Sequence, residues 1–168
     1  MLRMFIILVS LALLPALGGC GTIYKASVDE RDVGTFVDDS RIESTVRARF
    51  VQDNLVLLRD VSVNSYNGRV YLVGEFQSDT QKMRAVKLAQ SVAGVGKVTV
   101  VSFPKREDPT CGTAEELSLY AKIKAALVQD GDIWSTQVDI KVVQCNVVLL
   151  GLVARQRDAD AIVGYANA

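Results

Sequence analysis

Two stretches of this chain repeat each other at a fixed distance. Residues 46–53 (VRARFVQD) resemble residues 123–130 (IKAALVQD), which lie 77 positions later. The same offset, without a gap, pairs six more positions of like type: Val61 with Val138, Val63 with Ile140, Val70 with Val147, Leu72 with Leu149, Gly74 with Gly151 and Ala89 with Ala166. Because the pattern holds over about 50 positions, it predicts two related modules in tandem.

The first copy begins with a predicted helix and a predicted hairpin. Ser40, with Glu43 three residues later, forms the pattern of a capping box, which predicts a helix over about 41–52. Apolar residues alternate on both sides of Asn67-Gly68, the strongest short signal for a tight hairpin turn. Two antiparallel strands are therefore expected, at about 61–65 and 70–76.

A second helix and a third strand complete the first copy. Ser78 with Gln81 predicts another capping box, the helix ends at Gly94, and residues 98–103 are typical of a strand. The order αββαβ predicts a two-layer α+β sandwich, small enough for about 65 residues. Four glycines are expected to serve the backbone of the two copies: Gly68, Gly74, Gly94 and Gly151.

The second copy follows a polar linker at 104–112 and repeats the order in part. Thr113 with Glu116 predicts a capped helix, strands are expected at 138–143 and 147–153, and a further helix begins near Arg157. With the offset of 77, Phe103 corresponds to position 180, twelve residues after position 168. The last strand of this copy is therefore missing, and we expect it either in a continuation of the sequence, which we favour, or from another chain.

The first 20 residues are typical of an export signal. Arg3 precedes an apolar run at 4–14 that is too short to cross a bilayer, which needs about 20 residues as a helix. Leu17-Gly18-Gly19-Cys20 resembles the bacterial lipobox, in which the cysteine is lipidated, with palmitate among the acyl chains, and the chain is cut just before it. We expect a signal peptide over 1–19, lipidation of Cys20 and a tether over 20–38; an ordinary cleaved signal is the alternative.

Composition excludes several classes of function. The chain contains no histidine, which removes Ser-His-Asp and Cys-His arrangements and histidine-ligated metal sites. No P-loop, G-x-S-x-G or G-x-G-x-x-G motif is present. The acidic pairs Asp38-Asp39 and Glu115-Glu116 are interpreted as residues of helix starts. With 19 basic and 19 acidic side chains, no overall charge attracts nucleic acid. We expect no catalytic residue, metal, cofactor or nucleic-acid partner.

The αββαβ order, Gly74 repeated as Gly151, and Val92-Ala93-Gly94-Val95 before Val98 together resemble the BON domain. Two copies behind a lipobox are similar to dual-BON outer-membrane lipoproteins of the DolP type, and residues 32–39 (DVGTFVDD) look like the start of their first domain. The resemblance implies BON domains at 39–103 and 113–168, the second incomplete. It also implies a non-enzymatic lipoprotein on the periplasmic face of the outer membrane, which supports membrane integrity and contacts anionic phospholipid through the first helix of the second module.

On that helix, Tyr120, Lys122 and Lys124 are expected to lie largely away from the core residues. With Trp134 they form the candidate lipid-binding site, because lysines are attracted to anionic lipid and aromatic tips favour the headgroup region. A solvated helix face, with Trp134 packed over the core, is the alternative. For the whole protein, the alternative function is a protein-protein scaffold of an envelope complex that never touches lipid headgroups.

Two cysteines, Cys111 and Cys145, remain besides Cys20. In an oxidising periplasm they can form a disulfide between the linker and the hairpin turn of the second copy, where Cys145 takes the place of Gly68. Closing a loop of about 35 residues contributes on the order of 3 to 4 kcal/mol. The alternative is two free thiols that merely pack.

Overall fold

The structure is a computed structural model that describes residues 31–106 and 111–168. The expected signal peptide, Cys20 and most of the expected tether lie outside the described residues. The first module contains α3 (Val33–Val51), β1 (Val61–Tyr66), β2 (Arg69–Phe76), α4 (Asp79–Gln90) and β3 (Lys97–Pro104). The second contains α5 (Thr113–Gln129), β4 (Val138–Val143), β5 (Asn146–Gly151) and α6 (Gln156–Asn167).

The repeat is visible residue by residue in the fold. The bounds of β1 and β4, and those of α4 and α6, differ by the offset of 77. The antiparallel register is also repeated, because Val61 pairs with Gly74 and Val138 pairs with Gly151. The predicted tandem of α+β modules is thereby confirmed.

The two sheets differ in their number of strands. The first has the order β1-β2-β3, with β1 and β2 antiparallel and β2 and β3 parallel. A parallel neighbour requires a crossover, which α4 provides. Among the described residues, the second sheet contains only β4 and β5, which are antiparallel.

Each module buries its core between its sheet and its own helices. In the first module α3 and α4 cover one face of the sheet, where Val46, Leu72 and Ala85 are fully buried. In the second, Ile123 and Leu127 of α5 and Ile162 of α6 meet β4. These residues follow the helical and strand periodicity that is expected of elements packed against a core.

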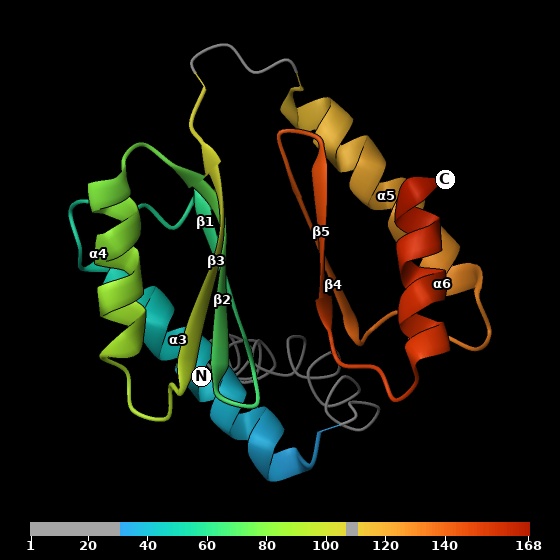
Figure 1. The fold of residues 1–168 in the computed structure, drawn as a ribbon, viewed down its shortest axis with the longest axis horizontal. Coiled ribbons are helices and arrows are strands. Elements are labelled where there is room, and N and C mark those ends of the chain that lie inside the picture. The colour runs from blue at the N-terminus through green and yellow to red at the C-terminus, as the bar shows by residue number, and fades with distance from the viewer. Residues whose placement is uncertain (1–30, 107–110) are drawn as a thin grey trace, which may run out of the picture.

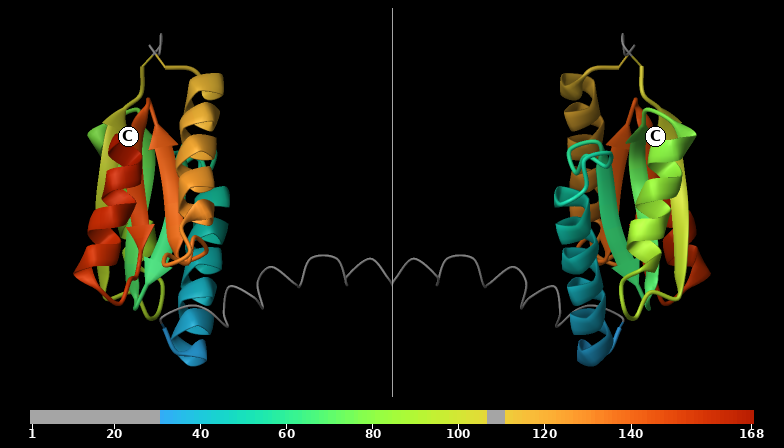
Figure 2. Two further views of the ribbon diagram at one scale, coloured as in Figure 1. Left: turned by 90° about the vertical axis from the view of Figure 1, so that its right-hand side faces the viewer. Right: turned by 90° about the vertical axis from the view of Figure 1, so that its left-hand side faces the viewer.

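The other faces of the two sheets lie against each other, so that the molecule has four layers with helices outside (Figure 1). Side views place α3 and α5 toward one side and α4 and α6 toward the other (Figure 2). Val73 points away from the core of its own module and is nonetheless fully buried. Its burial shows that the modules pack as one body.

Polar side chains take part in the packing between the sheets. The Tyr66 hydroxyl donates to a carboxylate oxygen of Asp139, and the Asn64 amide donates to the same oxygen at 3.3 Å. Burial, followed by the Asp139 charge, raises the pKa of Tyr66 above its ordinary value, so that the hydroxyl remains a donor. The two modules are therefore joined by hydrogen bonds as well as by apolar contact.

The predicted start of the first helix is wrong. α3 begins at Val33, and the carboxylate of Asp32 caps it by accepting from the Thr35 backbone N–H at 3.1 Å. Ser40 lies inside the helix, where its hydroxyl donates to the Phe36 carbonyl. Its supposed capping partner, Glu43, accepts from the backbone N–H of Ser65 on β1 at 2.8 Å. The acidic cap at position 32 thus adds two turns to the helix.

The other two predicted caps have different outcomes. Ser78 is the N-cap of α4 and accepts from the Gln81 N–H, as predicted. The prediction for α5 is wrong by one residue, because Gly112 is the N-cap and Glu115 accepts from its N–H at 3.0 Å. Glu116 instead accepts from the backbone N–H of Gln144 in the hairpin turn.

Close backbone approach explains the repeated strand glycine. A Cβ on Gly74 would lie 2.0 Å from the Asp60 carbonyl oxygen, and one on Gly151 would lie 2.2 Å from that of Gln137. No side chain fits at either position. Gly94 lies beyond the end of α4 with a φ of +92°.

The two hairpins use the same backbone geometry with different residues. Asn67 and Gly68 have φ values of 52° and 70°, as a type I′ turn requires, and Gln144 and Cys145 have 51° and 58°. Cys145 is joined to Cys111 by a disulfide with the two Cα atoms 5.7 Å apart. The second turn therefore holds two non-glycine residues in the left-handed region beside a crosslink to the linker.

The buried Asp39 of α3 binds the strand end and the hairpin turn of the first module. Its carboxylate is 2% exposed and accepts four hydrogen bonds, from Arg31 Nη1 (2.6 Å), Ser65 Oγ (2.7 Å), Asn67 N (2.7 Å) and Gly68 N (2.9 Å). The prediction that the Asp38-Asp39 pair belongs to a helix start is wrong, since both lie within α3. Asp39 instead ties this helix to the hairpin turn.

Replacing Asp39 with Asn should lower the free energy of unfolding by about 3 kcal/mol at pH 7, because Arg31 loses a buried partner. Burial raises the pKa of Asp39, but the bonds from Ser65, Gly68, Arg31 and Asn67 outweigh it and hold the pKa below its ordinary value. Its contribution is therefore complete above the unfolded pKa and is lost as the pH falls through the folded pKa. Urea unfolding between about pH 7 and 3 measures both effects.

The matched control is Asp38→Asn. The Asp38 side chain is 68% exposed and pairs with Arg41 at 3.3 Å, so its loss should change stability by less than about 0.5 kcal/mol. Equal losses for the two variants would contradict the role of Asp39.

Removal of the disulfide should lower the free energy of unfolding by an amount that depends on the residue that replaces Cys145. Cys145→Ser should lose about 3 kcal/mol of unfolding free energy. Cys145→Gly should be about 1 kcal/mol more stable than Cys145→Ser, because only glycine adopts the left-handed turn without strain. Alkylation without reductant is the check on the bridge itself: two labels on Cys111 and Cys145 would show free thiols.

Candidate functional site

The candidate lipid-binding residues lie on α5 and in the loop after it. Tyr120 is 40% exposed, Lys122 is exposed and Lys124 is half-buried. Two apolar residues of the same helix, Leu117 and Val128, are 65% and 63% exposed. The helix thus has an apolar surface that its own module does not cover.

Helical geometry sorts these residues into two groups. Residues three or four apart lie on one side of a helix, whereas residues two apart are separated by about 200°. Leu117, Tyr120, Lys124 and Val128 follow the first spacing, and we call them the α5 stripe. Lys122 lies on the opposite flank from Tyr120 and Lys124, so the structure does not bring all three candidates together.

Lys124 has a defined partner beside the stripe. Its ammonium donates to the backbone carbonyl of Ser135 at 2.6 Å, which fixes the loop after α5 to the helix. Lys124 is the cation that accompanies the apolar residues of the stripe.

Trp134 lies apart from the stripe. It is 53% exposed and lines a hollow of about 320 Å³ together with Gln137, Val153 and Arg155. The neighbouring Ile133 is the residue of this loop that packs into the core. Tyr120 is nine residues from the end of α5, or roughly 13 Å along the helix axis, so the two aromatic candidates do not share one small site.

Charge is distributed unequally between the modules. Residues 31–106 carry twelve basic and eight acidic side chains, a net charge of +4, whereas residues 111–168 carry five basic and seven acidic ones, a net charge of −2. The module that contains the α5 stripe has no net attraction for an anionic surface. Contact of this face with lipid would depend mainly on apolar and aromatic insertion.

Leu117 and Val128 are not among the lipid-binding residues expected from the sequence. Both follow the i, i+3, i+7 and i+11 spacing from Leu117 through Tyr120 and Lys124, a signal that was present in the sequence. The core spacing of Ile123 and Leu127 on the same helix is the stronger pattern, so the weaker spacing of the exposed apolar residues was not recognised.

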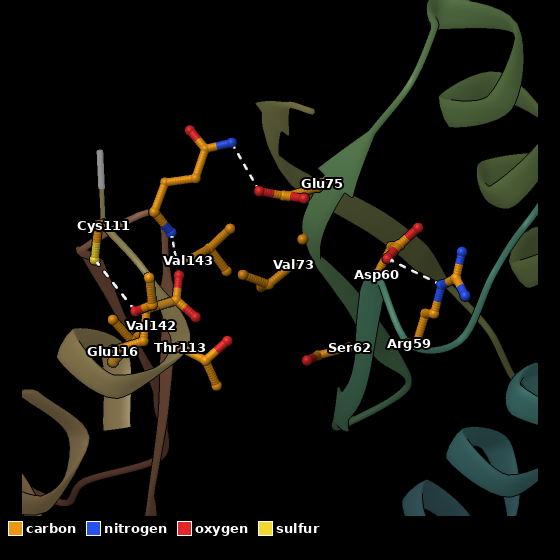
Figure 3. A pocket seen from close by; sticks show the side chains of 13 residues that line it. Arg59, Asp60, Ser62, Val73, Glu75, Cys111, Thr113, Glu116, Val142 and Val143 are labelled. Carbon is orange, nitrogen blue, oxygen red and sulfur yellow. Dashed lines mark hydrogen bonds and ion pairs between the residues drawn. The ribbon is translucent and has the colours of Figure 1, made fainter. Parts of the chain in front are cut away.

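A cleft of about 340 Å³ lies between the modules near the linker (Figure 3). Asp60 and Glu75 reach it from the first module, and Glu116 and Val143 from the second (Figure 3). Gln144 closes one side, because its side-chain amide donates to Glu75 at 2.8 Å and to the Pro104 carbonyl at 2.7 Å. The cleft therefore lies at the contact between the two modules. The hairpin turn of the second module and its disulfide form one border of the cleft.

The carboxylates of this cleft are already engaged. Asp60 accepts from Lys105 Nζ at 2.8 Å, and Glu116 accepts from the Gln144 N–H. In the part of the chain that the structure describes, no group of three histidine, cysteine, aspartate or glutamate side chains has the geometry of a metal site. Nor does any helix among the described residues have the length and apolar content to cross a membrane.

The chain resembles known proteins over most of its length. It matches the BON domain over residues 38–101 and 117–168. It is 32% identical over 146 residues to the osmotically-inducible protein Y of Escherichia coli (strain K12), which covers 86% of this chain and 73% of the relative. It is 30% identical over 154 residues to the outer membrane lipoprotein DolP of Haemophilus influenzae, covering 90% and 78%.

A third relative is the 21 kDa hemolysin of Actinobacillus pleuropneumoniae, which is 30% identical over 141 residues, or 81% of this chain and 71% of the relative. The two matched segments fall on the two modules of the fold, one on 31–106 and the other on 111–168. The resemblance seen in the sequence is thus confirmed: the chain belongs to the BON domain family and carries one BON domain in each module.

Proposed function

We propose that this chain is an envelope lipoprotein that binds phospholipid surfaces and thereby supports the integrity of the outer membrane. The observation that carries the proposal is the α5 stripe, which exposes Leu117, Tyr120 and Val128 on a helix of the second module. The likeness to a relative named as an outer membrane lipoprotein supports the location. The proposed activity has no catalytic step.

The stripe is suited to the boundary between headgroups and acyl chains. Leu117 and Val128 offer aliphatic surface, which gains about 0.8 kcal/mol for each methylene removed from water. Tyr120 combines an apolar ring with a hydroxyl, and such rings favour the interface. Lys124 places a positive charge beside them, where an anionic headgroup adds about 1 kcal/mol.

With the proposed lipid anchor, the α5 stripe needs only a low affinity for the membrane. Lipidation of Cys20 would hold the protein on the membrane, since two or more acyl chains give durable attachment. The stripe then acts on a surface that is already near. Its role is to orient the second module against the membrane rather than to capture the membrane from solution.

Loss of the apolar residues should weaken vesicle binding. We expect Leu117→Ser combined with Val128→Ser, in a chain that begins at Gly21 and has no acyl anchor, to reduce partition onto phosphatidylglycerol vesicles by at least about tenfold. Flotation measures the bound fraction. The control is Met83→Ser, at a residue of α4 with 63% exposure, which should leave the partition within about twofold. Unchanged binding of the double variant would contradict the proposal.

The two lysines should differ, since only one lies on the stripe. Lys124→Gln should weaken binding to anionic vesicles by about fivefold and leave binding to neutral vesicles unchanged. Lys122→Gln, the matched control on the opposite flank, should have little effect on either. Titration of each variant with anionic and with neutral vesicles measures these affinities. An equal loss of affinity for anionic vesicles in the two variants would show that the stripe does not face the lipid.

A further inference from the structure

The loop between α3 and β1, residues 52–60, is tied to the rest of the first module. The carboxylate of Asp53 accepts from the backbone N–H groups of Leu55 at 2.9 Å and Val56 at 3.2 Å. The side-chain amide of Gln81 on α4 donates to the Leu55 carbonyl at 2.6 Å, and Val56 is fully buried in the core. The backbone of the loop is therefore held by both α4 and the core.

The second module builds the same loop. By the offset of 77, Asp130 corresponds to Asp53, and its carboxylate accepts from the Asp132 N–H at 2.8 Å. The next residue, Ile133, packs into the core of its module as Val56 does in the first. The turn and its core residue are thus repeated in the two loops.

The exposed positions of the two loops differ in chemistry. Leu55 corresponds to Asp132 and Leu58 to Ser135, while Trp134 is the exposed apolar residue of the second loop. Leu55 is 54% exposed and Leu58 is 36% exposed. Because the repeated loop forms with polar residues at both places, the two leucines are not needed to build it. Their exposed aliphatic surface is available for contact with an apolar phase.

The charged side chains around the first loop are arranged with the cations outside. Asp53 pairs with Arg84 at 2.7 Å, and Asp60 pairs with Lys105 at 2.8 Å. The two carboxylate side chains are only 7% and 10% exposed, whereas those of Arg84 and Lys105 are 44% and 32% exposed. Arg59 beside Leu58 is 76% exposed, with its Nε 3.6 Å from Asp60. The loop therefore presents positive charge to its surroundings.

We propose that Leu55, Leu58 and Arg59, which we call the loop patch, form a second site of membrane contact and enter the headgroup region of an anionic phospholipid bilayer. The leucines reach the boundary with the acyl chains, and Arg59 binds lipid phosphate. The inference rests on the proposed function for the presence of a phospholipid surface, but it uses other residues in the other module.

Charge and position favour a bilayer as the partner of the patch. Residues 31–106 carry a net charge of +4, whereas the module with the α5 stripe carries −2. Figure 2 shows the loop that follows α3 on the same side of the molecule as α5. An anionic surface on that side would meet the apolar stripe of one module and the cations of the other. The first module thus supplies the attraction that the second lacks.

Loss of the leucines should weaken binding to anionic vesicles. In a chain that begins at Gly21, Leu55→Ser with Leu58→Ser should reduce partition onto phosphatidylglycerol vesicles by about tenfold, as measured by flotation. The control is Val33→Ser with Val37→Ser at the other end of α3, where the side chains are 64% and 56% exposed. This control should change the partition by less than about twofold. An equal loss in the two double variants would overturn the proposal.

The arginine of the patch should act through charge. Arg59→Gln should weaken binding to phosphatidylglycerol vesicles by about fivefold and leave binding to phosphatidylcholine vesicles unchanged. The matched control is Arg41→Gln, because Arg41 is also an exposed arginine paired with a neighbouring aspartate, at 3.3 Å. A loss of the same size in both variants would show a general attraction of the module and would contradict a defined patch.

A reporter on the loop separates this inference from the proposed function. An environment-sensitive dye on Leu55→Cys should shift its emission to the blue when phosphatidylglycerol vesicles are added. It should do so also in a chain with Leu117→Ser and Val128→Ser, once enough lipid is present for binding. The same dye on Met83→Cys, on the side of α4 that adjoins β3, should not shift.

The two proposals fail in different ways. A shift at position 55, together with unchanged binding of the stripe variant, would contradict the role of the α5 stripe and support the loop patch. Bound protein without a shift at position 55 would overturn the loop patch and leave the stripe standing. Emission that is already blue-shifted before lipid is added, together with a dimer in light scattering, would assign the patch to protein contact and overturn the inference as well.

Discussion

Leu72 and Val73 are neighbours on β2 that point to opposite faces of the sheet, and both are fully buried. A two-layer module on its own buries only one face, so the burial of Val73 requires the second module. The four-layer arrangement, the cleft near Gln144 and the polar contacts of Tyr66 all follow from this requirement. Packing of the inner faces joins two small modules, each of which has a modest core, into one packed unit.

Much of the fold was predictable because local signals and the repeat agree. Asn67-Gly68 specifies a type I′ turn by residue type, and Ser78 caps its helix as expected. The Gln144-Cys145 turn has the same geometry without glycine, so only the repeat indicates it. The first helix was placed too late because Ser40 mimics a cap that Asp32 provides.

Packing between the sheets was not predictable from residue types. The inner faces combine Asn64 and Tyr66 with Val73 on one side and Asp139 on the other, a mixture that is typical of a solvated face. Burial of such residues is favoured when they form hydrogen bonds across the interface, as Tyr66 and the Asn64 amide do with Asp139. For the candidate site, the sequence located α5, whereas the division between the flank of Lys122 and that of Lys124 required helical phase.

The contact between Tyr66 and Asp139 also distinguishes one copy of the repeat from the other. By the offset of 77, the first copy has Ser62 where the second has Asp139, and the second has Val143 where the first has Tyr66. Two first copies facing each other would lack the acceptor, and two second copies would bury a carboxylate without its phenol. Divergence at these two positions therefore favours the pairing of unlike copies, because the phenol and its acceptor come from different modules.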